Sequence, residues 1–152
     1  MTVAPDLASL LRGSSAVDHD EQAFVFLTVD EHGYPNPALL SRAELDVSAT
    51  GSVLAVVAST RTKANLLRDG RATLIAVHGT VAHYAKLRVI AHVEEPRLLG
   101  VVCAVVEHKR DSLGIELTPI TFRTSETIAT LEHWDASSQL LQALEALEHS
   151  LR

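Results

Sequence analysis

The sequence predicts a mainly β fold, a small closed or half-closed barrel of six antiparallel strands with peripheral helices. Six segments carry the alternating or β-branched patterns that are typical of strands. The helical segments between them are few and short. The strands do not alternate with crossover helices, as a parallel α/β sheet would require. Closure into a barrel would remove the exposed edges of such a sheet.

The first half of the chain is expected to form an antiparallel meander. Residues 5–12 have apolar positions at helical spacing and predict a short leading helix. "AFVFLTVD" (23–30) is rich in β-branched and aromatic residues, and the turn signals "DEHGYPNP" close it. A second strand is expected over 38–47, and the turn "SATGS" connects it to a third over 53–59.

The second half is expected to contain a short helix, a hairpin, a longer helix, a last strand and a C-terminal helix. Gly70 is a plausible C-terminal cap for the short helix. Pro96 suits the first turn of the longer helix, although the β-branched residues that follow would also suit a buried strand. Pro119 breaks the last strand. The five elements are expected over 62–69, 71–79 paired with 81–95, 96–110, 114–124 and 136–151.

Length and composition indicate one ordinary globular domain over 1–152, with residues 1–20 as an N-terminal helical segment. The chain has 152 residues, of which 47% are apolar and 21% charged. A net charge of -6 argues against a nucleic-acid-binding surface. The longest apolar stretch, 98–106, is about half of a membrane span, and no signal-peptide pattern is visible. We therefore expect a cytoplasmic protein without nucleic-acid or membrane partners.

Cysteine and histidine usage gives no reason to expect a metal. Cys103 is the one cysteine, so no disulfide framework is possible, and its apolar surroundings favour a buried hydrophobe. His78 and His83 lie five positions apart across an expected turn, which is no known metal-ligand pattern. The sequence therefore predicts no metal site, and it singles out no catalytic acid or base.

The stretch "STRTKANLLRDGR" (59–71) places Arg61 and Lys63 where a helix begins. Cations there are mildly unfavourable, because the unpaired N–H groups already carry partial positive charge. The hydroxyl groups of Ser59, Thr60 and Thr62, with the cations and the helix N–H groups, would suit a bound phosphate. The alternative is that Thr60 or Thr62 is simply an N-cap and both cations are solvated.

A second group of positive residues lies on the strand expected over 81–94. Alternation along a strand places successive side chains on opposite faces. One face would carry Leu87, Val89, Ala91 and Val93, and the other Tyr84, Lys86, Arg88, Ile90 and His92. The second face is either exposed to solvent or lines a site for a polar or anionic ligand.

The order of these motifs resembles the pyridoxamine 5′-phosphate oxidase-like family of FMN-binding split barrels. A meander precedes "ST-R-T-K-x-N-L", then "RDGRATL", then a hairpin whose second strand carries "KLRVIAHVEE". The similarity covers about residues 20–95 well and the rest loosely. It implies a split β-barrel of the FMN-binding type, a small-molecule substrate, and a homodimer with cofactor sites at the interface.

The resemblance also implies roles for individual residues. The segment Ser59 to Lys63 would bind the FMN phosphate, with Lys63 first, and Asn65 and Leu66 would serve helix packing. The strand from Ala38 to Arg42 would lay its backbone against the flavin ring at Leu40, Ser41 and Arg42, with the Arg42 side chain directed towards the phosphate. Lys86 and Arg88 occupy positions where the oxidase has a glutamine and an arginine. A lysine at the pyrimidine edge would favour the reduced, anionic flavin.

The C-terminal part departs from the oxidase. "SETIATLEHWDASSQ" lacks its basic, histidine-bearing segment, so we do not expect pyridoxamine phosphate as substrate. Trp134 could cover a flavin, in its own or the partner's site, or simply pack the last helix. The leading hypothesis is an FMN-dependent oxidoreductase. The alternatives are a deazaflavin cofactor, or a barrel that holds flavin or haem without turnover, with His83 or His92 as axial haem ligand.

Overall fold

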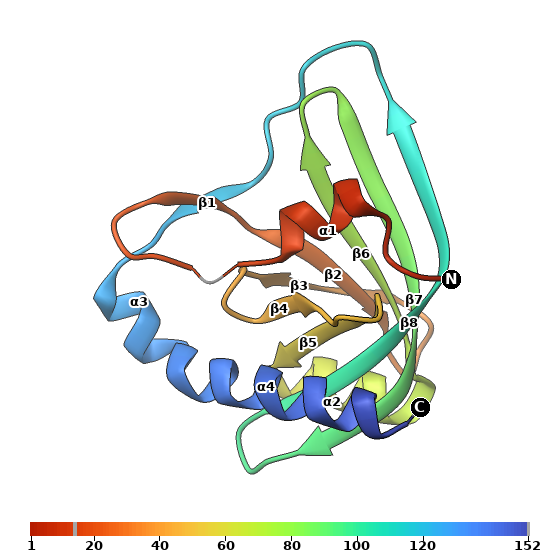
Figure 1. Ribbon diagram of the computed structural model, residues 1–152, viewed down its shortest axis with the longest axis vertical. Helices are drawn as coiled ribbons and strands as arrows, with labels where there is room; N and C mark the ends of the chain where they lie inside the picture. Colours follow the sequence, from red (N-terminus) through yellow and green to blue (C-terminus); the bar gives the residue numbers. More distant parts are fainter. Residues whose placement is uncertain (14, 152) are drawn as a thin grey trace.

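A seven-stranded antiparallel sheet curls into a half-barrel and forms the body of the protein (Figure 1). The computed structural model describes residues 1–13 and 15–151. The strand order is β3-β2-β6-β7-β8-β5-β4, and β1 pairs separately with β9. The strands are β1 (Asp20–Gln22), β2 (Phe24–Val29), β3 (Pro35–Leu40), β4 (Leu45–Val47), β5 (Val53–Val57), β6 (Arg71–His78), β7 (Val81–Glu94), β8 (Leu99–Ser112) and β9 (Thr121–Arg123).

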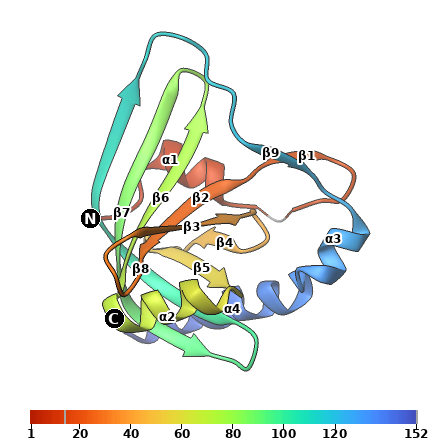
Figure 2. The same ribbon diagram turned by 180° about the vertical axis from the view of Figure 1, so that it is seen from behind.

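The helices cover the ends and one side of this barrel. Helix α1 closes one end with the buried side chains of Leu7 and Leu11, and α2 closes the opposite end with Leu66. Figures 1 and 2 show these two helices at opposite ends of the barrel. Helix α4 packs outside β5 and β8. The helices are α1 (Pro5–Leu11), α2 (Thr60–Asp69), α3 (Glu126–Leu131) and α4 (Trp134–Ser150).

The predicted mainly β, antiparallel barrel is confirmed, but six strands were too few. The strand expected over 38–47 is divided into β3 and β4 by a turn from Ser41 to Glu44. The backbone N–H of Ser41 donates to the Glu44 carboxylate (2.9 Å), and the N–H of Glu44 donates to the Ser41 carbonyl (3.0 Å). These two hydrogen bonds replace the ladder bonds of a continuous strand.

The helix expected over 96–110 was wrong, because this segment is strand β8. Its first half is buried on both faces: Val101, Cys103 and Val105 join the barrel interior, and Val102 joins a second cluster beneath α4. Burial on both faces produces a continuous apolar run without alternation, which a buried helix would share. Gly100 permits the close approach of α4, since a Cβ there would meet Leu140 at 2.9 Å.

The remaining elements differ mainly in their bounds. The last strand spans only Thr121–Arg123 rather than 114–124, and α3 was not predicted. The N-terminal and C-terminal helices lie within two residues of the expected bounds. Gly70 ends α2 in the left-handed conformation (φ 69°), as predicted. No helix within the described ranges is long and apolar enough to cross a membrane.

Candidate cofactor site

The start of α2 has unsatisfied donors and no acidic residue. Ser59 is the N-cap, and its Oγ accepts a long hydrogen bond (3.4 Å) from the Thr62 N–H, so neither threonine is the cap. The N–H groups of Thr60 and Arg61 meet no acceptor among the described residues. Ser59, Thr60 and Arg61 are all exposed. This first turn therefore presents free N–H groups and positive charge to its surroundings, which is the environment that favours an anion.

The two cations of this turn point to different neighbours. Arg61 lines an open pocket of about 350 Å³ beside the acidic turn Asp30–His32, together with Arg68. Lys63 places its Nζ 3.5 Å from the Arg97 carbonyl, in the turn between β7 and β8. An anion at the start of α2 would therefore lie between Arg61, on the β2–β3 side, and Lys63, on the β7–β8 side.

A buried polar network fixes α2 to the sheet beneath it. Thr62 turns inward and is 1% exposed, and its Oγ1 accepts from the Asn36 amide (3.2 Å). The Asn65 amide donates to the Thr28 hydroxyl (2.9 Å). The packing role predicted for Asn65 agrees with this contact. The inward position of Thr62 makes its hydroxyl a structural group, so an exposed ligand would meet the Thr60 hydroxyl instead.

Leu40, Ser41 and Arg42, which were expected at the flavin ring, do not line the Arg61 pocket. Leu40 belongs to the barrel core, and Ser41 is buried in the turn after β3. The guanidinium of Arg42 donates to the Arg12 carbonyl (2.7 Å), directly after α1. Its Nε is buried without a hydrogen-bond partner. In this conformation Arg42 shares neither a pocket nor a hydrogen bond with Lys63, so these two predicted residues are not brought together.

Arg42 instead lines an open pocket of about 580 Å³ beneath α4, together with Trp134. Trp134 is 9% exposed and begins α4, and its Nε1 is buried without a hydrogen-bond partner. This burial agrees with the simplest expectation for Trp134, that it packs the last helix against the barrel.

Lys86 and Arg88 lie in a third place, on the outer face of β7. They line an open pocket of about 710 Å³ whose floor includes Leu27 and Val106. Lys86 forms an ion pair with Glu107 (2.9 Å), while Arg88 stands directly across from Arg71 on β6. Arg88 has no ion pair with any described residue.

Lys86 and Arg88 are exposed opposite Leu87, as predicted. The predicted alternation fails further along, because a bulge between Val89 and Ala91 places Ala91 and Val93 against the cluster under α4, while Leu87 and Val89 face the barrel interior. Neither Lys86 nor Arg88 lines the Arg61 pocket.

Glu44 is a notable group that sequence reasoning missed. Burial raises the pKa of its carboxyl to about 7, although the Ser41 N–H favours the charged form. Perturbed carboxyl groups of this kind occur both at functional sites and in structural turns. No sequence signal could have revealed it, because residues 38–47 are patterned as one continuous strand.

The histidines form no metal site within the described part of the chain. No group of three or more metal-ligating side chains gathers there. His83 is 3% exposed, and its Nδ1 lies 2.9 Å from the Nε2 of His108. This contact occupies the Nδ1 of His83, so that nitrogen is not free to bind a haem iron. His92 is exposed on β7 and lines none of the three pockets.

Comparison with known sequences identifies one curated relative. No family model matches the chain. An uncharacterized protein of Bacillus subtilis (strain 168), YclD, is 39% identical over 82 residues. The match covers 53% of this chain and 53% of YclD, so it spans about half of each protein.

Solved structures identify the fold. An FMN-binding protein from Syntrophomonas wolfei subsp. wolfei superposes with a TM-score of 0.55 at 16% identity, over 70% of this chain and 84% of that one. The fold is the FMN-binding split barrel. The flavin reductase of styrene monooxygenase from Pseudomonas putida S12 gives a TM-score of 0.52 at 11% identity, over 68% and 87% of the two chains.

A third solved structure has a similar fold. A nitrilotriacetate monooxygenase component B homologue from Mycobacterium thermoresistibile gives a TM-score of 0.53 at 12% identity, over 70% of this split-barrel chain and 77% of its own. These likenesses confirm the predicted fold type. At such low identities they show the fold alone.

Proposed function

We propose that this split-barrel protein binds FMN by its phosphate at the start of α2 and acts as an FMN-dependent oxidoreductase on a small molecule. The observation that carries the proposal is the first turn of α2. It combines two free N–H groups, the Thr60 hydroxyl and two cations, and the turn itself has no carboxylate; the nearest ones, Asp30 and Glu31, line the pocket beside Arg61. These are the groups that a phosphate monoester needs. The FMN-binding protein and the flavin reductase that share this fold support a flavin as the molecule that carries the phosphate.

The residues present fit such a cofactor. Lys63 and Arg61 would neutralise the phosphate, and the N–H groups of Thr60 and Arg61 would hydrogen-bond to it. When bound, FMN supplies the hydride-transfer chemistry. The described residues contribute binding and orientation, with Arg88 free to hold a second anionic or polar group. The substrate is proposed to differ from pyridoxamine phosphate, because the C-terminal segment lacks the basic residues that such a ligand needs.

A homodimer through the outer face of the sheet is part of the proposal. Cross-strand pairs place Leu39 beside Val25 and then Ile75, and Pro37 beside Leu27. Exposed apolar side chains continue along this face: Val29, Leu39 and Val106 are 41%, 57% and 55% exposed. Figure 2 looks onto β2, β3 and β6 from this side, and no described helix lies across them. Contiguous apolar surface of this kind marks an interaction site.

The first test is the visible spectrum of the purified protein, with mass analysis of whatever denaturation releases. Released FMN supports the proposal. A deazaflavin or haem in its place would contradict the assignment of the cofactor, and a protein that ignores added FMN would contradict flavin binding altogether. Lys63→Ala is expected to weaken FMN binding by about 1.5–3 kcal/mol, the range for a hydrogen bond to a charged group. Arg123→Ala removes one positive charge from β9, away from α2, and should leave the affinity unchanged.

The dimer has its own test. Sedimentation equilibrium is expected to give twice the chain mass for the wild type and the single mass for Leu39→Arg, because a charge would be buried in an apolar interface. Leu67→Arg, on an exposed position of α2, is the control. A monomeric wild type would contradict the dimer and leave the phosphate site as a separate proposal.

A further inference from the structure

A pocket of about 580 Å³ lies between α4 and β4, at one edge of the sheet. Its lining includes the cation Arg42, in the turn before β4, and the aromatic side chain of Trp134, at the start of α4. Three carboxylates line it as well: Asp46 of β4, and Asp135 and Glu145 of α4. The pocket shares no residue with the one at the start of α2, so it is a separate place in the fold.

The side chain of Arg42 is held in place by the residues that follow α1. Its Nη2 donates to the Arg12 carbonyl (2.7 Å), one residue beyond α1. The next residue is Gly13, where a Cβ would overlap the same nitrogen, so the guanidinium packs directly against the Gly13 backbone. Arg12 is fixed in turn, because its own guanidinium donates to the Ser48 carbonyl (3.2 Å). The direction of Arg42 is therefore set by the chain itself.

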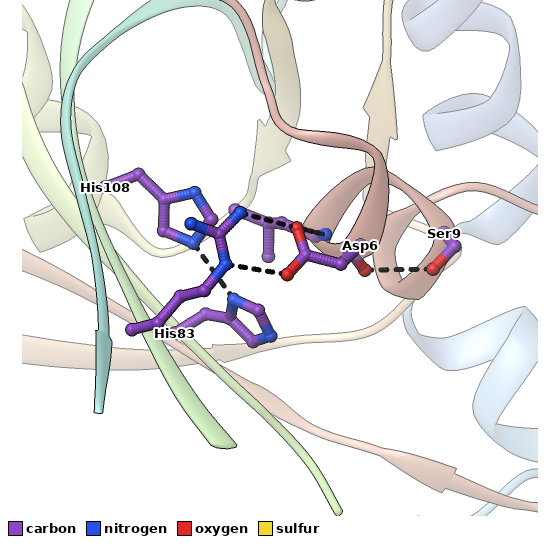
Figure 3. A network of polar contacts seen from close by, with 6 residues as sticks. Asp6, Ser9, His83 and His108 are labelled. Carbon is purple, nitrogen blue, oxygen red and sulfur yellow. Dashed lines mark hydrogen bonds and ion pairs between the residues drawn. The ribbon is translucent and has the colours of Figure 1, made fainter. Parts of the chain in front are cut away.

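Helix α1, which ends just before these residues, is anchored to the barrel. Asp6 accepts two hydrogen bonds from the Arg110 guanidinium of β8 (2.7 and 2.8 Å), an ion pair drawn in Figure 3. Leu7 and Leu11 of the same helix enter the barrel core. A cation that is already in position binds an anion with a smaller loss of conformational entropy. The anchored helix therefore prepares Arg42 for an anionic group.

The hydrogen-bond donors of Arg42 and Trp134 are not all satisfied. Arg42 has no ion pair with any described residue, and its Nη1 donates to none of them. The Nε of Arg42 and the Nε1 of Trp134 are buried without a hydrogen-bond partner among the described residues, and Trp134 is only 9% exposed. Both side chains are donors without an acceptor, so neither can satisfy the other. This part of the pocket favours a ligand group that accepts hydrogen bonds, and a carboxylate matches the guanidinium best.

The three carboxylates of the pocket oppose a simple anion as the ligand. One cation against three carboxylates leaves the lining with an excess of two negative charges, and like charges in contact repel. None of the three forms an ion pair with a described residue, while Asp46 and Glu145 each accept one backbone N–H (2.8 and 3.0 Å). Each carboxylate therefore has accepting capacity left for a cation. A ligand with one carboxylate and ammonium groups matches both kinds of lining charge.

We propose that this pocket binds a basic amino acid, with the carboxylate on Arg42 and the ammonium groups directed at the three acidic side chains. Such a molecule carries one negative and two positive charges, which complement the charges of the lining. Its methylene groups would pack against Leu141 and the indole of Trp134. The pocket volume lies in the range of small-molecule sites. The proposal involves neither FMN nor the dimer, so it stands or falls independently of the proposed function.

The fluorescence of Trp134 tests this site, because the chain has no other tryptophan. The probes are L-lysine, cadaverine, which is lysine without its carboxylate, and L-norleucine, which is lysine without its side-chain ammonium. Titration of the purified protein with L-lysine should change the fluorescence saturably. L-lysine is expected to bind at least about tenfold more tightly than either analogue, because each analogue lacks one charge-assisted contact.

Two variants test the two ends of the ligand separately. Arg42→Gln should remove the preference for L-lysine over cadaverine, and Asp135→Asn should reduce the preference for L-lysine over L-norleucine. Lys109→Gln, which removes an exposed cation of β8 outside the pocket, should leave both preferences unchanged.

Three results would overturn the proposal: no saturable change with L-lysine, equal affinities for L-lysine and cadaverine, or a preference over cadaverine that survives in Arg42→Gln. If Arg42→Gln does not fold, Asp135→Asn decides, because its exposed position should tolerate the change. An unchanged preference over L-norleucine in that variant would then contradict the site.

Discussion

The two ends of the barrel are closed in different ways. At one end α1 inserts Leu7 and Leu11, which are 1% and 0% exposed. At the other end α2 rests on hydrogen bonds between Thr62 and Asn36 and between Asn65 and Thr28. Apolar packing tolerates small shifts of a helix, whereas a buried polar side chain that shifts loses its hydrogen bond at a high cost. The α2 end is therefore the better place for a rigid binding site.

The largest expected loss of stability follows a substitution in α1. Leu11→Ala removes a fully buried side chain and should lower the free energy of unfolding by about 3 kcal/mol. FMN affinity should remain unchanged, because this end does not contact the proposed phosphate site. Urea denaturation measures the first quantity and flavin fluorescence titration the second. Leu67→Ala, on the exposed side of α2, is the matched control. A large loss of FMN affinity in Leu11→Ala would break the contrast between the two ends.

At the α2 end, removing a buried side chain should lower both the stability of the protein and its affinity for FMN. Asn65→Ala removes the closer donor of the buried Thr28 hydroxyl (2.9 Å) and leaves only the long contact from the Asn36 amide (3.5 Å), so it should cost about 1–3 kcal/mol of stability. FMN affinity should fall as well, since the first turn of α2 is no longer held in place. Comparing denaturation and FMN titration with those of Leu11→Ala measures the contrast directly. Reduced stability with unchanged affinity would show that the site does not depend on this network.

Glu44, in the turn between β3 and β4, makes the stability of the folded protein depend on pH. Its folded pKa of about 7 lies above the unfolded value near 4.5, so the folded state holds the proton more tightly. Stability from this group is complete below pH 4.5 and is lost as the pH rises through 7. Glu44→Gln, which keeps an acceptor for the Ser41 N–H, should stabilise the protein by about 1–3 kcal/mol at pH 8 and hardly at pH 4. Equal effects at both pH values would contradict the raised pKa.

The smallest expected effect is a change in the reduction potential of bound FMN, caused by substituting Lys86 on the outer face of β7. Lys86→Gln should lower the reduction potential of bound FMN, because a nearby cation favours the anionic reduced flavin. The ion pair with Glu107 offsets part of that charge, so the change should be small. Spectroelectrochemistry measures it, with Lys109→Gln as a matched control on β8. An unchanged potential would remove Lys86 from the site.

The sequence predicted what depends on neighbouring residues and failed where distant contacts decide. The start of α2 was recognised because its capping residue, cations and hydroxyl groups are contiguous. Strand β8 was taken for a helix because burial on both faces removes the alternation that identifies a strand. Arg42 was expected at the cofactor because nothing local shows that the Arg12 carbonyl, 30 positions away, holds it. The His83–His108 contact spans 25 positions and was missed for the same reason.

The most direct measurement compares FMN with riboflavin, which has the same ring but no phosphate, by fluorescence titration of the wild type and Lys63→Ala. The phosphate site predicts that the wild type binds FMN at least about tenfold more tightly than riboflavin, as expected for a charge-assisted hydrogen bond. It also predicts that Lys63→Ala removes most of that preference. Equal affinities of the wild type for the two molecules would contradict a phosphate site at the start of α2.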